Sequence, residues 1–169
     1  VARIKQTSFN ILKLVKSGKS IDEIKTEINS SLEYYWTTNT FIEEIKWDYV
    51  YGRNWDRAIL LLVEYFLSDN NSQNYISIGN KLHLEHILPR TPKEDWLTIF
   101  TEEERKKWTN SLANLTLLSM RKNIQASNSS FNIKKEAYEN RDNVISSFLI
   151  TQKVINCNNW NVDELEKRE

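Results

Sequence analysis

Apolar residues near the start of the chain recur with the spacing of α-helices. Phe9 and Leu12 lie on one face of a first predicted helix, and Gly18 lies just past its end. Ser20 and Glu23 then have the spacing of a capping box, in which each side chain accepts a hydrogen bond from a main-chain amide at a helix start. The pattern therefore predicts two successive helices.

A third predicted helix is apolar on nearly every side. It runs from about Arg53 to Leu67, and residues 59–63 are all apolar. A helix of this kind is expected to be central and buried. A polar run at 69–74 follows it, so we expect residues 1–74 to form a helical N-terminal part.

Two short apolar segments in the middle of the chain predict β-strands. The first, 81–88, is ended by Pro89, and the second spans 114–119. Between them, Thr91 and Thr101 each precede an acidic residue by three positions, which is the spacing that opens a helix. A helical insert is therefore predicted between the two strands.

The rest of the pattern completes the expected fold. A long helix is predicted from Phe131 to about Val154. The order of helices, strand, helical insert, strand and helices indicates a single α+β domain that is predominantly α-helical. Its two strands and the helix after them would form a core over residues 79–135, followed by C-terminal helices at 136–169.

Composition supports a packed globule. Hydrophobic residues make up 40% of the 169 positions, and of six Trp residues we expect Trp96, Trp108 and Trp160 in the core. The longest apolar run, 58–63, is far shorter than the ~20 residues that span a bilayer, so no membrane partner is expected. The single cysteine, Cys157, excludes an intrachain disulfide and a Cys-rich zinc site, and a cytoplasmic location is expected.

Charge is unevenly distributed although the chain carries no net charge. Between positions 105 and 135 there is no acidic residue, and the basic residues are Arg105, Lys106, Lys107, Arg121, Lys122, Lys134 and Lys135. A local basic surface can bind phosphates even on a neutral domain. The run is equally compatible with an ordinary solvated helix face, so it supports a nucleic-acid partner without requiring one.

The candidate chemistry lies on the two predicted strands and the helix after them. The two histidines, His83 and His86, are on the first strand, where Glu85 precedes His86; Asn114 begins the second strand and Asn123 follows nine residues later. A histidine can accept a proton from water near neutral pH, and carboxylate and amide oxygens suit Mg²⁺ or Mn²⁺. Taken singly, a His or an Asn more often has a structural role, so the inference depends on the combination.

Together these segments resemble one known family. The matching motifs are Glu85-His86-Ile87-Leu88-Pro89, Leu112-Ala113-Asn114-Leu115-Thr116-Leu117-Leu118, Asn123, Asn128 and Phe131-Asn132-Ile133-Lys134-Lys135. They look like the HNH-like nuclease domain, with a ββα-metal (His-Me finger) core, at the C-terminus of GmrSD-type modification-dependent restriction enzymes. The resemblance covers roughly residues 80–138.

The resemblance implies roles for the central residues of these motifs. His86 would be the general base, and Asn114, on the facing strand, would orient its imidazole. Glu85 and Asn123 would be the ligands of a single divalent metal. Because Glu85 and His86 are adjacent on a strand, both can reach one metal only if the strand twists or ends there.

Three further residues are candidate substrate contacts. By the resemblance, Asn128 and Lys134 would contact the phosphate or order the local loop. His83 lies two residues before Glu85 and would face the same side of the strand. Asn128 could instead be a helix cap, Lys134 could be a solvated surface residue, and His83 could be structural.

The sequence therefore predicts a metal-dependent DNA endonuclease that uses Mg²⁺ or Mn²⁺, and the resemblance implies that it restricts modified phage DNA. The resemblance also implies an N-terminal, nucleotide-hydrolysing ParB-like domain. A chain that begins at Val1 without a leader is accordingly expected to be the C-terminal part of a longer protein. A homodimer would supply the two sites needed to cut both strands. The alternatives are a catalytically silent DNA-binding or interaction domain, and an RNase that uses the same site.

Overall fold

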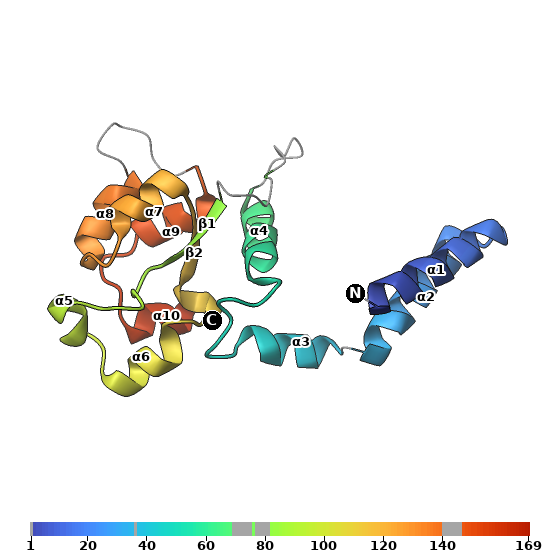
Figure 1. Cartoon of the computed structure of the whole chain (residues 1–169), viewed down its shortest axis with the longest axis horizontal. Coiled ribbons are helices and arrows are strands. Elements are labelled where there is room, and N and C mark those ends of the chain that lie inside the picture. Colours follow the sequence, from blue (N-terminus) through green and yellow to red (C-terminus); the bar gives the residue numbers. More distant parts are fainter. Residues whose placement is uncertain (1, 36, 69–75, 77–81, 140–146) are drawn as a thin grey trace. The chain divides into compact units, whose positions relative to one another are not determined.

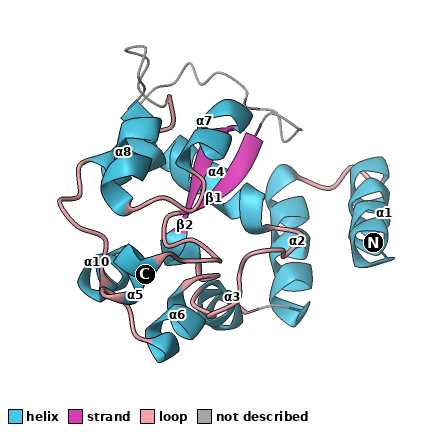
Figure 2. Cartoon of the chain, turned by 60° about the vertical axis from the view of Figure 1, so that its left-hand side comes forward, coloured by secondary structure: helices cyan, strands magenta, loops and turns pink. Residues whose placement is uncertain are grey.

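The computed structural model describes the chain except for residues 1, 36, 69–75, 77–81 and 140–146. Its described residues form helices and one small sheet of two strands, shown in magenta in Figure 2. The fold is therefore α+β and predominantly α-helical, as predicted. No described helix is long and apolar enough to cross a bilayer. By contacts the chain divides into two compact units, Val1–Ile45 and Lys46–Glu169.

The N-terminal unit is helical. It contains α1 (Ala2–Lys16), α2 (Ile21–Tyr35) and α3 (Thr38–Ile45). α1 and α2 pack against each other, and Gly18 between them has φ +71°, a conformation that glycine adopts readily. Ser20 and Glu23 exchange the two hydrogen bonds of the predicted capping box, at 2.9 and 3.2 Å. The first two predicted helices are thus confirmed, whereas α3 was not predicted.

The C-terminal unit holds both strands and the helices around them (Figure 1). In chain order its elements are α4 (Asp56–Leu67), β1 (Leu82–His86), α5 (Glu94–Leu97), α6 (Glu102–Trp108), the 3-10 turn η1 (Leu112–Asn114), β2 (Leu115–Ser119), α7 (Met120–Ala126), α8 (Phe131–Glu139), α9 (Leu149–Ile155) and α10 (Val162–Arg168). The predicted helical insert between the strands is present as α5 and α6. Thr101 and Glu104 form the predicted capping box of α6.

The two strands pair antiparallel, with Leu84 opposite Leu117 and His86 opposite Leu115. Because successive side chains point to opposite faces of a sheet, His86 shares a face with Leu84, and Glu85 lies on the other face. α7 follows β2 directly and packs against both strands. The predicted arrangement of two strands and a following helix is therefore present.

Two clusters of buried side chains hold the C-terminal unit together. One joins α4, both strands and α9 through Leu60, Leu61, Leu82, Leu115, Leu117 and Ile150. The other joins the helical insert, α7, α8 and the C-terminal helices. It includes Trp96, Trp108 and Trp160, each at most 1% exposed, which confirms that these three rings belong to the core.

A buried carboxylate connects α4 to the start of α9. Glu64 accepts hydrogen bonds from the main-chain amides of Leu149 and Ile150, at 2.8 and 2.9 Å. The first amides of a helix have no partner within the helix, and the partial positive charge there favours an anion. Glu64 therefore caps α9 from a distant part of the chain.

Two sequence predictions about helices are wrong. α4 is not buried all round, because Leu62 and Phe66 are 59% and 94% exposed. The predicted helix from Phe131 is not continuous, since α8 ends at Glu139 and Phe148 has an extended backbone directly before α9. Its middle, 140–146, and the predicted polar run at 69–74 lie outside the described residues.

The start of the first insert helix also differs from the prediction. α5 begins at Glu94, and Lys93 occupies the position before it without a side-chain cap. Thr91 lies in a bend and Pro92 in irregular chain before the helix, so neither residue opens it. The spacing between Thr91 and Glu94 resembles a capping box, but the proline-containing segment continues directly from the end of β1.

Candidate active site

His86 is the last residue of β1, and its imidazole contacts two residues from other segments. Its Nε2 lies 3.1 Å from Oδ1 of Asn110, and the ring of Tyr51 packs edge-on with its centroid 4.3 Å away. An amide oxygen accepts hydrogen bonds, so in this orientation the proton is on Nε2 and Nδ1 is the basic nitrogen. Neither contact was predicted, because no local pattern links Tyr51 or Asn110 to the strand.

Burial is the main influence on the protonation of His86. It lowers the pKa of His86 to about 4, and the nearby positive charges of Arg90 and Lys134 act in the same direction. The hydrogen bond to Asn110 acts the other way and raises the pKa. His86 is therefore neutral near pH 7, which is the form that can accept a proton.

Main-chain hydrogen bonds hold Asn110 in place. Its carbonyl accepts from the amides of Val50 at 2.8 Å and Tyr51 at 3.0 Å, and Tyr49 forms a parallel β-bridge with it. Val50 is fully buried. The segment before α4 thus supplies Tyr51 and also anchors the residue that contacts Nε2 of His86.

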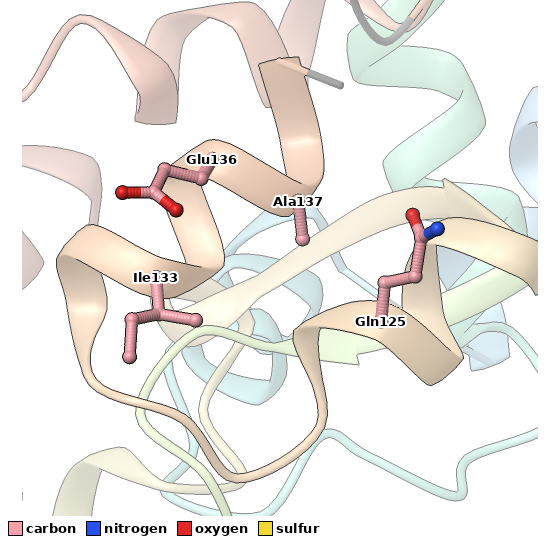
Figure 3. Close-up of a pocket in the computed structure, with 4 residues that line it drawn as sticks. All are labelled: Gln125, Ile133, Glu136 and Ala137. Carbon is pink, nitrogen blue, oxygen red and sulfur yellow. The ribbon is translucent and has the colours of Figure 1, made fainter. Parts of the chain in front are cut away.

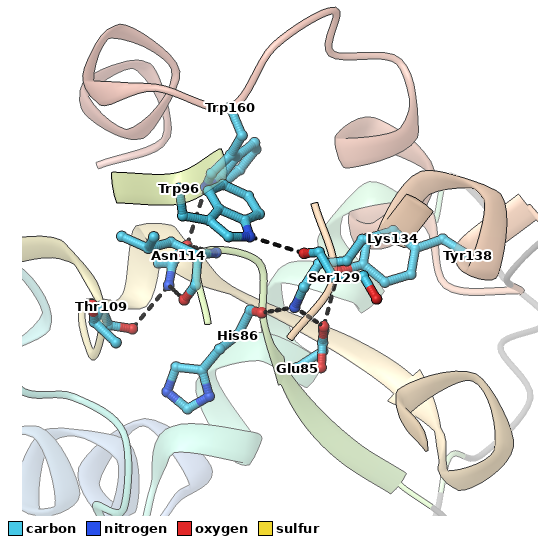
Figure 4. Close-up of polar contacts among 10 residues, drawn as sticks. Glu85, His86, Trp96, Thr109, Asn114, Ser129, Lys134, Tyr138 and Trp160 are labelled. Carbon is cyan, nitrogen blue, oxygen red and sulfur yellow. Dashed lines mark hydrogen bonds and ion pairs between the residues drawn. The ribbon is translucent and has the colours of Figure 1, made fainter. Parts of the chain in front are cut away.

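Asn114 does not contact the imidazole. Its fully buried amide accepts from the amide of Leu88 at 2.8 Å and the indole of Trp160 at 3.1 Å, and it donates to the carbonyls of Leu88 at 2.8 Å and Thr109 at 2.9 Å (Figure 4). All four hydrogen-bonding positions of the amide are occupied. The predicted direct orientation of the imidazole is therefore not observed. Asn114 instead fixes the chain two residues after His86.

Glu85 faces α8 and has a buried ion-pair partner. Its Oε1 lies 2.6 Å from Nζ of Lys134 and accepts from the hydroxyl of Tyr138 at 3.1 Å, while Lys134 also donates to the carbonyl of His86 at 2.6 Å (Figure 4). Burial raises the pKa of Glu85 and lowers that of Lys134, and their mutual attraction opposes both shifts. Glu85 and His86 therefore present their side chains to different surroundings.

The predicted phosphate contact of Lys134 is not supported by its position. Lys134 is buried, and its ammonium is bonded to Glu85 and to the carbonyl of His86. A fully buried ammonium offers no surface to an incoming phosphate. Lys134 instead ties α8 to the end of β1.

Asn123 has an oxygen that could receive a cation. It lies on α7, and its Oδ1 is the one buried side-chain polar atom without a hydrogen-bond partner among the residues that the structure describes. An unsatisfied buried acceptor costs about 1–3 kcal/mol, which a bound water or ion would relieve. This observation fits the predicted role of Asn123 as a ligand.

The donors present suit one kind of metal better than others. Within the described ranges, no group of three or more His, Cys, Asp or Glu side chains could hold a metal. Oε1 of Glu85 accepts both hydrogen bonds, and Oε2 takes part in neither of them. One carboxylate oxygen with the amide oxygen of Asn123 suits Mg²⁺, which keeps several waters, rather than a zinc ion held by four protein ligands.

The other two predicted substrate residues lie on β1 and in the turn after α7. His83 is half-buried on β1 opposite Leu118, and by alternation it shares a face with Glu85. Asn128 is half-buried in the turn between α7 and α8. The described contacts of the imidazole come from Tyr51 and Asn110.

Most of the predicted basic surface is used inside the fold. Arg105, Lys122 and Lys135 each donate to a main-chain carbonyl, and Lys134 is buried against Glu85. These contacts draw the ammonium and guanidinium groups toward the protein. Fewer positive charges are therefore available to a partner than the number of basic residues in the run suggests.

An exposed arginine that the sequence did not indicate lies beside the candidate base. The guanidinium of Arg90 is 5.5 Å from the centroid of the Tyr51 ring, which itself contacts His86. Arg90 is four residues after His86, past the end of the strand, so only the fold shows that the two are close in space. Its charge lowers the pKa of His86.

A separate hollow lies between α7 and α8. Figure 3 shows its lining, Gln125 from α7 and Ile133, Glu136 and Ala137 from α8. It contains none of the predicted site residues and no histidine or cysteine. We therefore assign the candidate site to the end of β1 and not to this hollow.

Comparison with known proteins identifies one family. Residues 22–169 match the family model described as GmrSD restriction endonucleases, C-terminal domain. The match includes both strands and every residue of the candidate site. A search of curated proteins finds no match.

Proposed function

Because the chain belongs to the family of C-terminal domains of GmrSD restriction endonucleases, we propose that it is a metal-dependent DNA endonuclease with His86 as its general base. That the chain is a nuclease domain of a restriction system follows from the family. The proposal of a metal and of His86 as the base depends on the site. The observation that carries it is the contact at the end of β1 in which Asn110 holds Nε2 of His86, and the lowered pKa of His86 agrees with it.

In the proposed reaction, Nδ1 of His86 accepts a proton from the water that attacks the phosphodiester. Asn110 holds the tautomer that leaves Nδ1 free, and Tyr51 limits rotation of the ring. A pKa of about 4 ensures that the base is unprotonated but makes it weak. A bound phosphate brings negative charge, which favours the imidazolium and would raise the pKa toward neutrality.

Two residues would hold the metal, Glu85 through Oε2 and Asn123 through Oδ1. A divalent cation there would neutralise charge on the phosphate and on the leaving oxygen. The unsatisfied oxygen of Asn123 supports this assignment. Mg²⁺ or Mn²⁺ is proposed because the donors are oxygens.

One alternative has structural support. Glu85 and His86 lie on opposite faces of β1, and Lys134 already neutralises Glu85. These features favour a catalytically silent DNA-binding or interaction domain that keeps the fold. An RNase remains the other alternative, since neither a base nor a metal distinguishes the two sugars. Modified phage DNA, a ParB-like N-terminal domain, a homodimer and a cytoplasmic location remain predictions from the resemblance and the composition.

Plasmid cleavage tests the proposal. The 169-residue chain would be incubated with supercoiled DNA and Mg²⁺, Mn²⁺ or EDTA, alongside His86→Ala. We expect metal-dependent nicking that falls at least about 100-fold in the variant, the usual contribution of a general base. Asn159→Ala, on the loop before α10, is the control and should cleave like the wild type.

Each alternative predicts a different result. Cleavage that is equal in the wild type and His86→Ala would contradict the assigned base. DNA binding without cleavage under any metal would favour the silent domain. RNA and DNA oligonucleotides of the same sequence, compared at the same concentrations, would identify an RNase.

A further inference from the structure

A surface with exposed aromatic rings adjoins the candidate base. It lies on the segment 47–53, which precedes α4, and the Tyr51 ring of this segment contacts His86. Trp47 and Tyr49 are 43% and 58% exposed. Large exposed apolar side chains that gather in one place often mark a binding surface.

Two arginines accompany these rings. The guanidinium of Arg53 lies 5.1 Å from the centroid of the Trp47 ring, and that of Arg90 lies 5.5 Å from the centroid of Tyr51. Both arginines are exposed, and neither forms an ion pair with a described carboxylate. An arginine stacked on a ring is pre-oriented and still presents N–H groups to a phosphate.

The backbone ties this surface to the imidazole. Tyr49 bridges to Asn110, and the amides of Val50 and Tyr51 donate to the Asn110 carbonyl. The side chain of Asn110 in turn contacts Nε2 of His86. The rings and arginines are therefore held at the site by the same residue that orients the candidate base.

We propose that Trp47, Tyr49, Arg53 and Arg90 form a contact surface for the DNA strand on which His86 acts. The proposal rests on the proposed function and names its substrate class. The two arginines bind phosphates that flank the scissile one, and the exposed rings stack on bases. Stacking on a side chain requires bases that are not paired, so this surface favours single-stranded or locally unpaired DNA over closed duplex.

The charge and chemistry of the segment support a nucleic acid over a protein partner. Asp48 is its one acidic side chain between positions 46 and 53, against Lys46, Arg53 and the adjoining Arg90. A combination of aromatic rings and arginines is typical of surfaces that bind a single strand. A protein partner would bury the rings but would leave the two arginines in need of acidic groups.

Fluorescence anisotropy of labelled DNA tests the proposal with the whole 169-residue chain. EDTA is present so that binding is measured without cleavage. The probes are one oligonucleotide as a single strand and the same sequence as a duplex. The variants are Trp47→Ala with Tyr49→Ala, and Arg53→Gln with Arg90→Gln.

A matched control removes two positive charges elsewhere. Lys153 and Lys167 are exposed and line a hollow at α9 and α10, and Lys153→Gln with Lys167→Gln should stay within about twofold of the wild type. Arg53→Lys with Arg90→Lys keeps the charges and should restore most of the salt dependence. Far-UV circular dichroism confirms that each variant is folded.

We expect the wild type to bind the single strand more tightly than the duplex. The ring variant should weaken single-strand binding about fivefold or more. On a single strand, the arginine variant should flatten the slope of log K against log salt by about 0.7 for each phosphate that it no longer neutralises. Both variants should also slow cleavage when metal is present.

Other outcomes would overturn the proposal. If the variants bind each probe as tightly as the wild type does, the surface is excluded. It is also excluded if the wild type binds no DNA. Both results would stand even if His86-dependent cleavage is established. Tighter binding to duplex than to single strand would exclude the substrate class. A change in oligomeric mass by light scattering, with unchanged DNA affinity, would assign the rings to a protein partner. Loss of the His86 requirement alone would contradict the proposed function and not this surface.

Discussion

Asn114 contributes to stability through the four hydrogen bonds of its buried amide. Replacing it with Ala would leave polar groups of Leu88, Thr109 and Trp160 unsatisfied, and each such group costs about 1–3 kcal/mol. We expect Asn114→Ala to lower the free energy of unfolding by about 3 kcal/mol or more. Urea titration followed by circular dichroism measures this change.

Asn110→Ala is the matched control for that prediction. It removes the same amide group, but the hydrogen bonds to Val50 and Tyr51 come from the main chain and remain. Its side chain bonds to His86, so the expected decrease in the free energy of unfolding is below about 1 kcal/mol. If the free energy of unfolding decreased equally in the two variants, the hydrogen bonds of the Asn114 amide would add no more stability than the one bond of the Asn110 side chain.

His86 should make stability depend on pH in the acidic range. Its pKa is about 4 in the folded chain and about 6.5 when unfolded. Between these values the unfolded chain binds a proton that the folded chain does not, so the free energy of unfolding falls as the pH falls from about 6.5 to about 4. Above about pH 6.5 the effect is absent.

His86→Gln isolates this contribution. Denaturant titrations of both chains between about pH 4 and pH 7 measure the difference in their free energies of unfolding. The raised pKa of Glu85 acts with the opposite sign, but it is common to both chains and cancels to first order. Parallel curves over the whole range would contradict a lowered pKa.

At the scale of the residue, the sequence predicted well which side chains lie near the sheet. It predicted less well which residues those side chains contact. His86 at the end of the first strand and Asn123 on the following helix are where the pattern indicated. The contacts of His86 come from Tyr51 and Asn110. These residues are 35 positions before and 24 positions after it, so only the fold reveals them.

At the scale of the element, a buried ion pair joins β1 to α8. Lys134→Met would leave the carboxylate of Glu85 buried without its partner, and we expect the free energy of unfolding to fall by about 3–5 kcal/mol. Adding Glu85→Gln removes the second charge and should restore at least half of that decrease. A double-mutant cycle by urea titration measures the coupling, and purely additive effects would contradict a direct pair.

Elements with local signals were predictable, and elements defined by distant contacts were not. The start of α2 depends on Ser20 and Glu23, three residues apart, and the pattern shows it. The start of α9 depends on Glu64, 85 residues before Leu149. No periodicity near α9 indicates that contact, so the sequence suggested one uninterrupted helix instead.

At the scale of the whole molecule, the candidate site belongs to one unit. Both clusters of buried side chains and the described contacts of His86 lie within residues 46–169. We therefore expect a 46–169 fragment to unfold cooperatively, with a midpoint within a few degrees of the full chain. Thermal denaturation followed by near-UV circular dichroism measures it.

A shorter fragment provides the comparison for that prediction. Residues 56–169 begin at α4 and lack Val50 and Tyr51, which anchor Asn110. This fragment should unfold at a lower temperature than 46–169, because it lacks the buried Val50 side chain and two main-chain hydrogen bonds. Identical midpoints for the two fragments would show that the segment before α4 adds nothing to the unit.

The bond between Trp160 and Asn114 has a consequence for synthesis of the protein. The indole lies 46 residues after the amide that it contacts, and Arg168 further on donates to the carbonyls on either side of Asn114. At about 5–20 residues per second, the ribosome adds Trp160 roughly 2–9 seconds after Asn114. During that interval a nascent chain carries Asn114 without its hydrogen bond from Trp160 and without the two bonds that Arg168 donates beside it. The buried amide that fixes the chain after His86 therefore gains its full set of hydrogen bonds only when Trp160, just before the C-terminal helix, has been synthesised.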